Sequence, residues 1–173
     1  LRGFRGVDTL TAMVFLTELG DLKRFANPRQ LMSYLGLVPS VHQSGDSRRD
    51  GSITKAGNSH VRHVLVQAAW NYFGASKVGK LLRQRQRDLP AWAVEQSSKA
   101  QKRLSKRVHH LTVTRGKCVA VVAAARELAC FLAYSLLTLD EQRASGIQLP
   151  EVDPATPIGR PPTKLTPSLP LNP

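Results

Sequence analysis

The chain has 173 residues, of which 42% are hydrophobic, enough for one domain with a buried core. Its 25 lysines and arginines against 12 acidic residues leave a net charge of +13, which favours nucleic acid as a partner over the role of a merely soluble or ribosome-like basic protein. Its two cysteines, Cys118 and Cys130, lack the spacing of a disulfide framework or a zinc site and are expected to be small buried apolar residues in a reducing compartment.

The first predicted element is a helix over residues 10–19, capped by Asp8 or Thr9. Gly3 and Gly6 form a tight turn before it. This arrangement resembles the second half of a helix-hairpin-helix motif, in which backbone N–H groups and a helix N-terminus bind a DNA phosphate. Both glycines are therefore candidate phosphate-binding residues, although an ordinary turn between helices explains the pattern equally well.

A second short helix is predicted to begin after Asn27, the N-cap, with Pro28 at its first position. Residues 38–55 lack helical periodicity and are expected to form an extended segment or a loose hairpin. The next helix is capped by Asn58 or Ser59, and its apolar stripe predicts a buried face made of Val61, Leu65, Ala68, Ala69 and Tyr72.

Two basic helices are expected next, over residues 77–87 and 99–107, each with five cations and no acidic residue. Such runs are usually solvated faces, but this density favours contact with phosphates. The DNA-binding candidates from the first run are Lys77, Lys80 and Arg83.

A long, mostly buried helix is predicted after the turn at residues 115–117. Arg126 and Glu127 interrupt its apolar run, and no segment has the layout of a signal peptide, so we expect no membrane span and a cytoplasmic location. Eight of the eleven prolines fall from residue 150 onward, which predicts a disordered tail. The expected organisation is a mainly α-helical domain over residues 1–140 and a Pro-rich flexible tail over residues 141–173.

Residues 42–58, HQSGDSRRDGSITKAGN, combine serines with cations. A serine hydroxyl attacks a phosphodiester when a base removes its proton and cations stabilise the developing charge. Three histidines could carry that proton: His42, His60 and His63. Spacing alone does not choose between the four serines Ser40, Ser44, Ser47 and Ser52.

A metal site is not predicted in this chain. Asp46 and Asp50 lie four residues apart, but in a non-helical stretch flanked by arginines, and the other acidic residues show no clustered pattern. Two-metal nuclease chemistry requires several converging carboxylates, which the sequence does not supply.

Six blocks in order carry a family resemblance: LRGFRGVDTLTAMVFLTELGD, RFANPRQLMSYLGLVPS, SG, GSITKAGNSHVRHVLVQAAW, RGK and ARELACFLAYSLL. They resemble the C-terminal transposase domain of a bacterial insertion-sequence family whose members pair a RuvC-like N-terminal domain with a serine-bearing C-terminal domain. Piv-type DNA invertases and recombinases guided by a bridge RNA are relatives. The resemblance covers about residues 1–138.

The resemblance implies that Ser44, the serine of the SG step, is a nucleophile that forms a transient covalent link to DNA. Charge and proximity then make further residues candidates for holding the scissile phosphate: Arg48, Arg49, Lys55, Asn58 and Arg62. The family's metal-binding carboxylates lie in the RuvC-like domain, where Mg²⁺ is expected, so no cofactor is expected in this chain. The expected partners are DNA, a guide RNA in members that use one, and further copies of the full-length protein.

The chain opens on a leucine and a glycine turn, and we therefore expect a fragment of a longer protein. The parent is expected to be a transposase or site-specific DNA recombinase, whereas the isolated fragment is expected to be inactive. The alternative is a non-catalytic, truncated nucleic-acid-binding module.

Overall fold

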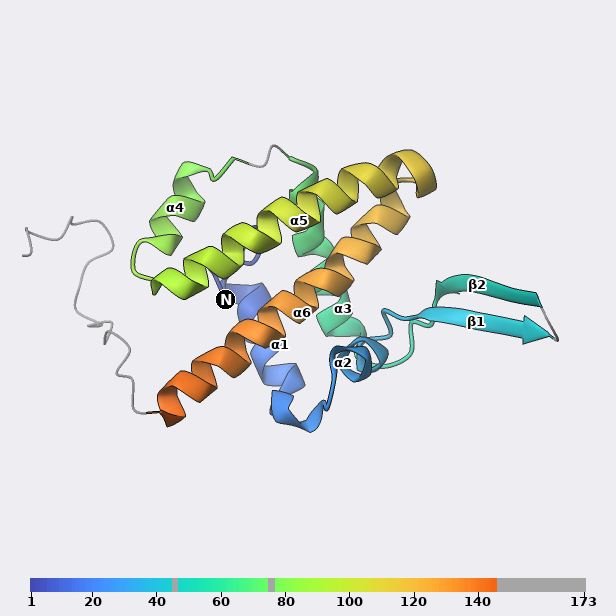
Figure 1. Cartoon of the computed structure of the whole chain (residues 1–173), viewed down its shortest axis with the longest axis horizontal. Coiled ribbons are helices and arrows are strands. Elements are labelled where there is room, and N and C mark those ends of the chain that lie inside the picture. Colours follow the sequence, from blue (N-terminus) through green and yellow to red (C-terminus); the bar gives the residue numbers. More distant parts are fainter. Residues whose placement is uncertain (45–46, 75–76, 146–173) are drawn as a thin grey trace, which may run out of the picture.

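The computed structural model describes residues 1–44, 47–74 and 77–145, which form a helical body with one β-hairpin (Figure 1). This confirms the mainly α-helical prediction. The elements in chain order are α1 (Thr9–Leu19), η1 (Leu22–Arg24), α2 (Pro28–Tyr34), β1 (Pro39–Ser44), β2 (Ser47–Ile53), α3 (Ser59–Trp70), η2 (Asn71–Phe73), α4 (Lys80–Gln86), α5 (Ala91–Arg115) and α6 (Lys117–Ala144).

Short polar side chains begin three of the helices. The carboxylate of Asp8 accepts a 2.7 Å hydrogen bond from the N–H of Thr11, and Asn58 caps α3 in the same way through Val61 N–H at 2.9 Å. Asn27 caps α2, which starts on a proline. These side chains satisfy backbone donors that no helical carbonyl reaches, and the predicted cap positions are confirmed.

The centre of the body is a hairpin of two long helices, α5 and α6, joined at Gly116 with φ 84°. Residues 99–107 were expected to be a separate basic helix, and this prediction is wrong because they form the middle of the 25-residue α5. Buried small and apolar residues on one face of α5, Ala100, Leu104 and Val108, make the helix continuous.

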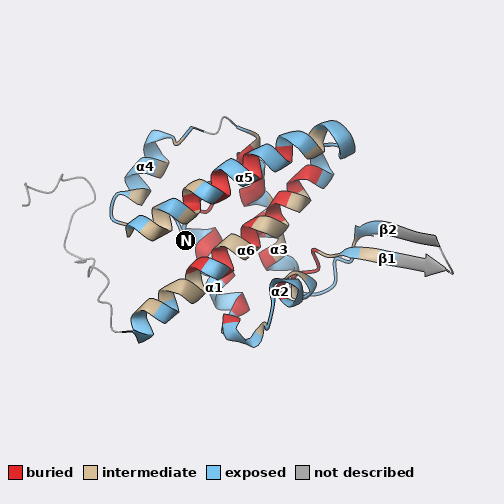
Figure 2. Ribbon diagram, viewed as in Figure 1, coloured by how far each residue is buried: buried red, intermediate tan, exposed pale blue. Residues whose placement is uncertain are grey.

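Small and apolar residues of α6 pack against α5 and α3, and the buried residues run along these three helices (Figure 2). Within the described residues, α6 is the one helix whose length and composition would allow it to cross a membrane. Half of its apolar stretch is buried in the protein. The helix continues to Ala144, past the boundary expected at residue 140, and the expected tail from residue 146 onward lies outside the described residues.

The two cysteines differ from the expectation that both are buried. Cys118 is exposed, because it lies in the first turn of α6, and Cys130 is half-buried. Burial raises the pKa of the Cys130 thiol.

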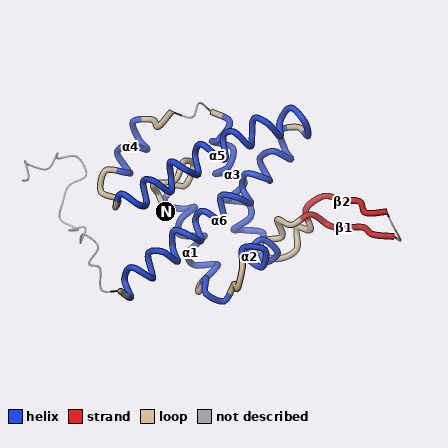
Figure 3. Tube along the Cα trace, in the orientation of Figure 1, coloured by secondary structure: helices blue, strands red, loops and turns tan. Residues whose placement is uncertain are grey.

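The β-hairpin extends away from the helical body (Figures 1 and 3). Its antiparallel register pairs Pro39 with Ile53 at the base and Ser44 with Ser47 at the far end. The N–H of Thr54 donates to the carbonyl of Val38 at 2.9 Å and continues the pairing below the strands. The prediction of a hairpin within residues 38–55 is confirmed.

Candidate nucleic-acid interface

Ser44 is the last residue of β1, at the end of the hairpin that lies away from the helices. Five residue steps separate it from Pro39 at the base, which corresponds to about 17 Å along a strand. Arg48 and Arg49 follow the partner of Ser44 on β2, so the backbone register places them at the same end. The hairpin therefore groups these three of the predicted residues.

Lys55, Asn58 and Arg62 lie at the opposite end, where the hairpin joins the body. Lys55 is exposed and has φ 56°, which turns the chain into the cap of α3. Arg62 is half-buried, and its Nη1 donates a 2.8 Å hydrogen bond to the carbonyl of Leu35. The structure thus separates these residues from Ser44 by most of the length of a strand, and it gives Arg62 an internal partner.

Asn58 takes part in a polar junction between α1 and α3. Its Nδ2 donates to Glu18 Oε2 at 2.7 Å, and Glu18 Oε1 lies 2.7 Å from Nδ1 of His60. Hydrogen bonds from Asn58 and from His60 hold the pKa of the Glu18 carboxyl below its usual value. This carboxylate, which the sequence reasoning missed, fixes the start of α3 next to the hairpin base.

The N-terminal turn is directed into the protein. The carbonyl of Gly3 accepts hydrogen bonds from Ser97 Oγ at 2.6 Å and from Gln86 Nε2 at 2.9 Å. Gly6 has φ 78°, and a Cβ there would collide with the carbonyl oxygen of Ala68. Both glycines therefore have packing roles in this fold, and their proposed contact with phosphate stays a prediction.

The exposed cations near α4 form one basic surface. The side chains of Lys77, Lys80 and Arg83 are exposed there, together with that of Arg87. Arg85 differs from them because its Nη1 donates to the carbonyl of Val7 at 3.2 Å and ties α4 to the N-terminal turn. The remaining cations are exposed, and their contact with phosphates stays a prediction.

The basic run on α5 is partly neutralised by acids from outside it. Glu127 of α6 accepts from Nε of Arg103 and of Arg107, each at 2.7 Å, because the antiparallel helices place these side chains opposite one another. Lys99 pairs with Glu95 one turn earlier, at 2.8 Å. Within the described residues, three of the five cations of this run are thus ion-paired.

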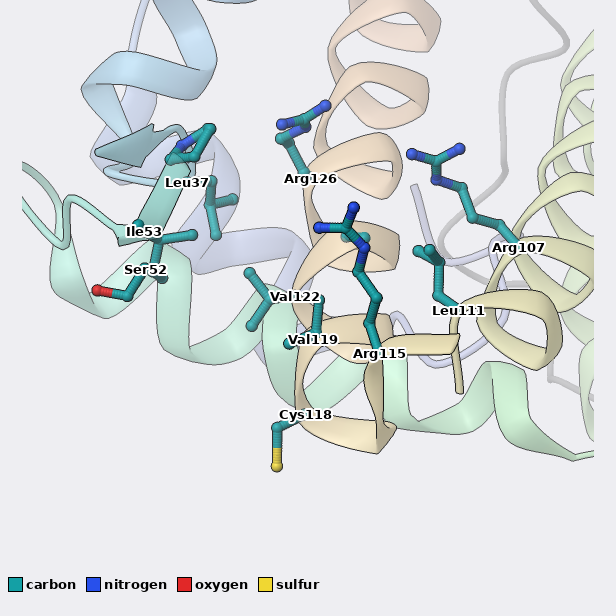
Figure 4. A pocket seen from close by; sticks show the side chains of 13 residues that line it. Leu37, Ser52, Ile53, Arg107, Leu111, Arg115, Cys118, Val119, Val122 and Arg126 are labelled. Carbon is teal, nitrogen blue, oxygen red and sulfur yellow. The ribbon is translucent and has the colours of Figure 1, made fainter. Parts of the chain in front are cut away.

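A groove with a volume of about 510 Å³ lies between the hairpin base, the end of α5 and the start of α6. Figure 4 shows three arginine side chains gathered on one side of it, Arg107, Arg115 and Arg126. The remaining lining is mostly aliphatic, with Leu37 and Ile53 from the hairpin base and Leu111, Val119 and Val122 from the helices. Sequence reasoning missed this groove, although an arginine inside an apolar helix was a signal that it faces a special environment.

Comparison with known proteins matches residues 1–83 to the transposase IS116/IS110/IS902 family. A candidate transposase of Sinorhizobium fredii, y4qE, is 47% identical over 134 residues, which is 76% of this chain and 34% of that protein. The transposase of insertion sequence element IS1533 from Leptospira borgpetersenii is 31% identical over 118 residues, 68% of this chain and 34% of its own length.

The chain thus spans about a third of the length of these two relatives. A protein of Pseudomonas aeruginosa that is described as a family 20 transposase is 33% identical over 69 residues, which is 40% of this chain and 20% of that protein. No solved structure matches the chain significantly.

Proposed function

Residues 1–83 match the IS116/IS110/IS902 transposase family, and on that premise we propose that the chain is the C-terminal part of a DNA transposase that presents Ser44 to a DNA strand. The observation that carries the proposal is the place of Ser44 at the far end of the projecting hairpin. A DNA backbone can approach a residue there without meeting the helical body.

The proposed step is a transesterification. Oγ of Ser44 forms a bond to the phosphorus of a phosphodiester, the bond from phosphorus to the leaving oxygen breaks, and that oxygen takes up a proton while a base receives the serine proton. Arg48 and Arg49 are the candidates for stabilising the charge on the non-bridging oxygens, because the register places them at the same end of the hairpin.

The rest of the active site belongs to the part of the protein beyond this chain. Among the described residues, no three histidine, cysteine or acidic side chains form a group that could hold a metal ion. We place the carboxylates, with their Mg²⁺, in a RuvC-like domain, and we propose DNA, a guide RNA and further copies of the protein as partners in the cytoplasm, away from the membrane.

A second candidate function for the isolated chain is nucleic-acid binding without catalysis. The observation that favours it is the separation of Lys55, Asn58 and Arg62 from Ser44, because cations at the hairpin base do not reach a phosphate held at its far end. The net charge of +13 and the exposed cations around α4 support binding on their own.

The test uses the full-length protein with DNA that carries the ends of the mobile element. Ser44→Ala should abolish covalent protein–DNA adducts and leave DNA binding within about twofold, because the hydroxyl contributes little to a charge-dominated interaction. Ser40→Ala and Ser47→Ala, on the same two strands, are the matched controls and should retain adducts. Adducts that persist in Ser44→Ala would rule out Ser44 as the nucleophile.

A further inference from the structure

The groove beside the hairpin base has two chemically different sides. Three arginines line one side, where Leu111 lies between Arg107 and Arg115, and aliphatic side chains from the hairpin base and from α6 form the other (Figure 4). We propose that this groove binds one unpaired nucleotide of a nucleic-acid strand, with its base against the aliphatic side and its phosphate on Arg115 and Arg126.

The charge of the groove selects an anion. Among the described residues that line it, none is acidic, and Glu127, which follows Arg126 in the chain, is already paired with Arg103 and Arg107. Nε of Arg126 is buried and has no hydrogen-bond acceptor within the part of the chain that the structure describes. A buried donor without an acceptor is unfavourable, and a turn of the Arg126 side chain, which lines the groove, would let a phosphate oxygen satisfy it.

The aliphatic side selects a flat apolar group attached to that anion. Val119 is 48% exposed although it lies among other aliphatic side chains. A free phosphate would leave this surface in contact with water, and a paired base presents only its edges to the groove. An unpaired nucleotide joins an anion to a base with an apolar face, so it covers both sides at once.

The volume agrees with such an occupant. Sites for small organic ligands occupy roughly 300–1,000 Å³, and this groove has about 510 Å³. Arginine also suits the occupant, because its planar guanidinium both binds phosphate oxygens in pairs and stacks on flat rings.

The position of the groove relates it to the hairpin, and this step rests on the proposed function. The base of the hairpin borders the groove, and Ser44 lies about 17 Å farther along β1 at roughly 3.4 Å per residue. The groove would therefore hold a nucleotide only a few positions from the phosphate that Ser44 attacks.

The 173-residue chain and a fluorescein-labelled oligodeoxythymidylate test the proposal by fluorescence anisotropy, with a duplex of equal length in parallel. Val119→Glu should weaken single-strand binding by about tenfold, because it removes a base contact and repels the phosphate. Val113→Glu is the matched control, since Val113 is an 88% exposed valine of α5 outside the groove. It should change the affinity by less than about threefold, the effect of one distant charge.

A second pair of variants tests the phosphate contact. Arg115→Gln with Arg126→Gln should lower the slope of log affinity against log salt by about 0.7 for the single strand, the value for the one phosphate contact that the two arginines share. Lys23→Gln with Arg29→Gln makes the same change of charge at exposed positions outside the groove and outside the two basic runs. Thermal unfolding by circular dichroism checks that all variants are folded.

Equal effects of the Val119 and Val113 substitutions, or of the two double substitutions, would overturn the proposal. So would equal competition by polyglutamate at matched charge, because the occupant would then be an acidic polypeptide. Ser44→Ala should bind the oligonucleotide normally in the same assay. If the groove substitutions weaken binding but Ser44 forms no adducts, the nucleotide site is supported and the role of Ser44 as nucleophile is rejected. If Ser44 forms adducts but the groove substitutions have no specific effect, the nucleophile is supported and the nucleotide site is rejected.

Discussion

The carboxylate of Glu18 lies 2.7 Å from Nδ1 of His60 and joins the last turn of α1 to the first turn of α3. Its second oxygen accepts a 2.7 Å hydrogen bond from Asn58, the cap of α3. One side chain thus fixes the helix start that follows the hairpin, and through it the direction in which the hairpin leaves the body.

This junction predicts a pH dependence of stability. Because the pKa of Glu18 is lower in the folded protein than its ordinary 4.5, its ionised form stabilises the fold above about pH 4.5, and that contribution is lost as the pH falls through the lower, folded-state value. Glu18→Gln should therefore flatten the acid side of the profile of unfolding free energy against pH, as measured by urea denaturation. Glu141→Gln, an exposed glutamate of α6, is the control and should keep the wild-type profile.

Gly57 packs against the backbone of α2 where the second strand returns to the body. It has φ 89°, and a Cβ there would collide with the carbonyl oxygen of Tyr34. Gly20 also has a positive φ, 59°, but nothing lies within 4 Å of the place of its Cβ. The two positions separate the cost of the backbone conformation from the cost of the collision.

Gly57→Ala should lower the free energy of unfolding by at least about 2 kcal/mol more than Gly20→Ala, because only the first substitution adds a collision with backbone. Urea denaturation of both variants measures the difference. Equal losses would mean that the hairpin base yields without cost and does not fix the hairpin.

Local signals in the sequence predicted much of the fold. Asp8, Asn27 and Asn58 mark helix starts because a short polar side chain before an apolar period satisfies free backbone N–H groups, and the structure shows all three as caps. The charge pattern of residues 99–107 predicts a separate basic helix. The continuous α5 does not follow from that local pattern, because its stability comes from apolar contacts with α6.

The site was predictable only in part. Neighbours along the chain, such as Ser44 and Arg48, stay together because a hairpin keeps them together. The ion pairs of Glu127 and the groove at Arg115 and Arg126 depend on which helix faces which, and single-residue patterns do not encode this. Arg62 stays a candidate for phosphate contact, and its hydrogen bond to the Leu35 carbonyl, a partner 27 residues away in sequence, is one that local patterns do not predict.

The basic surface around α4 should bind DNA without regard to sequence. Lys80→Gln, Arg83→Gln and Arg87→Gln together should weaken duplex binding by similar factors on unrelated sequences and lower the salt slope by up to roughly 2.7, about 0.9 for each contact. Fluorescence anisotropy at salt concentrations from about 50 to about 200 mM measures the affinity and the salt slope. A loss confined to one sequence would contradict contact with phosphates.

Arg103→Gln provides the comparison for that experiment. The charge of Arg103 is already compensated by Glu127, so its removal should change the salt slope by less than about 0.9, the value for one phosphate contact. A change as large as that per cation of α4 would show that the ion pair opens when DNA binds.

The most direct test of the account identifies the residue that becomes linked to DNA. The full-length protein is trapped on DNA, the DNA is removed with nuclease, and the peptides are sequenced by mass spectrometry. We predict that a nucleotide remnant is found on Ser44. A remnant on another residue, or adduct-free protein under conditions in which strands are exchanged, would contradict the proposal that the hairpin carries the nucleophile.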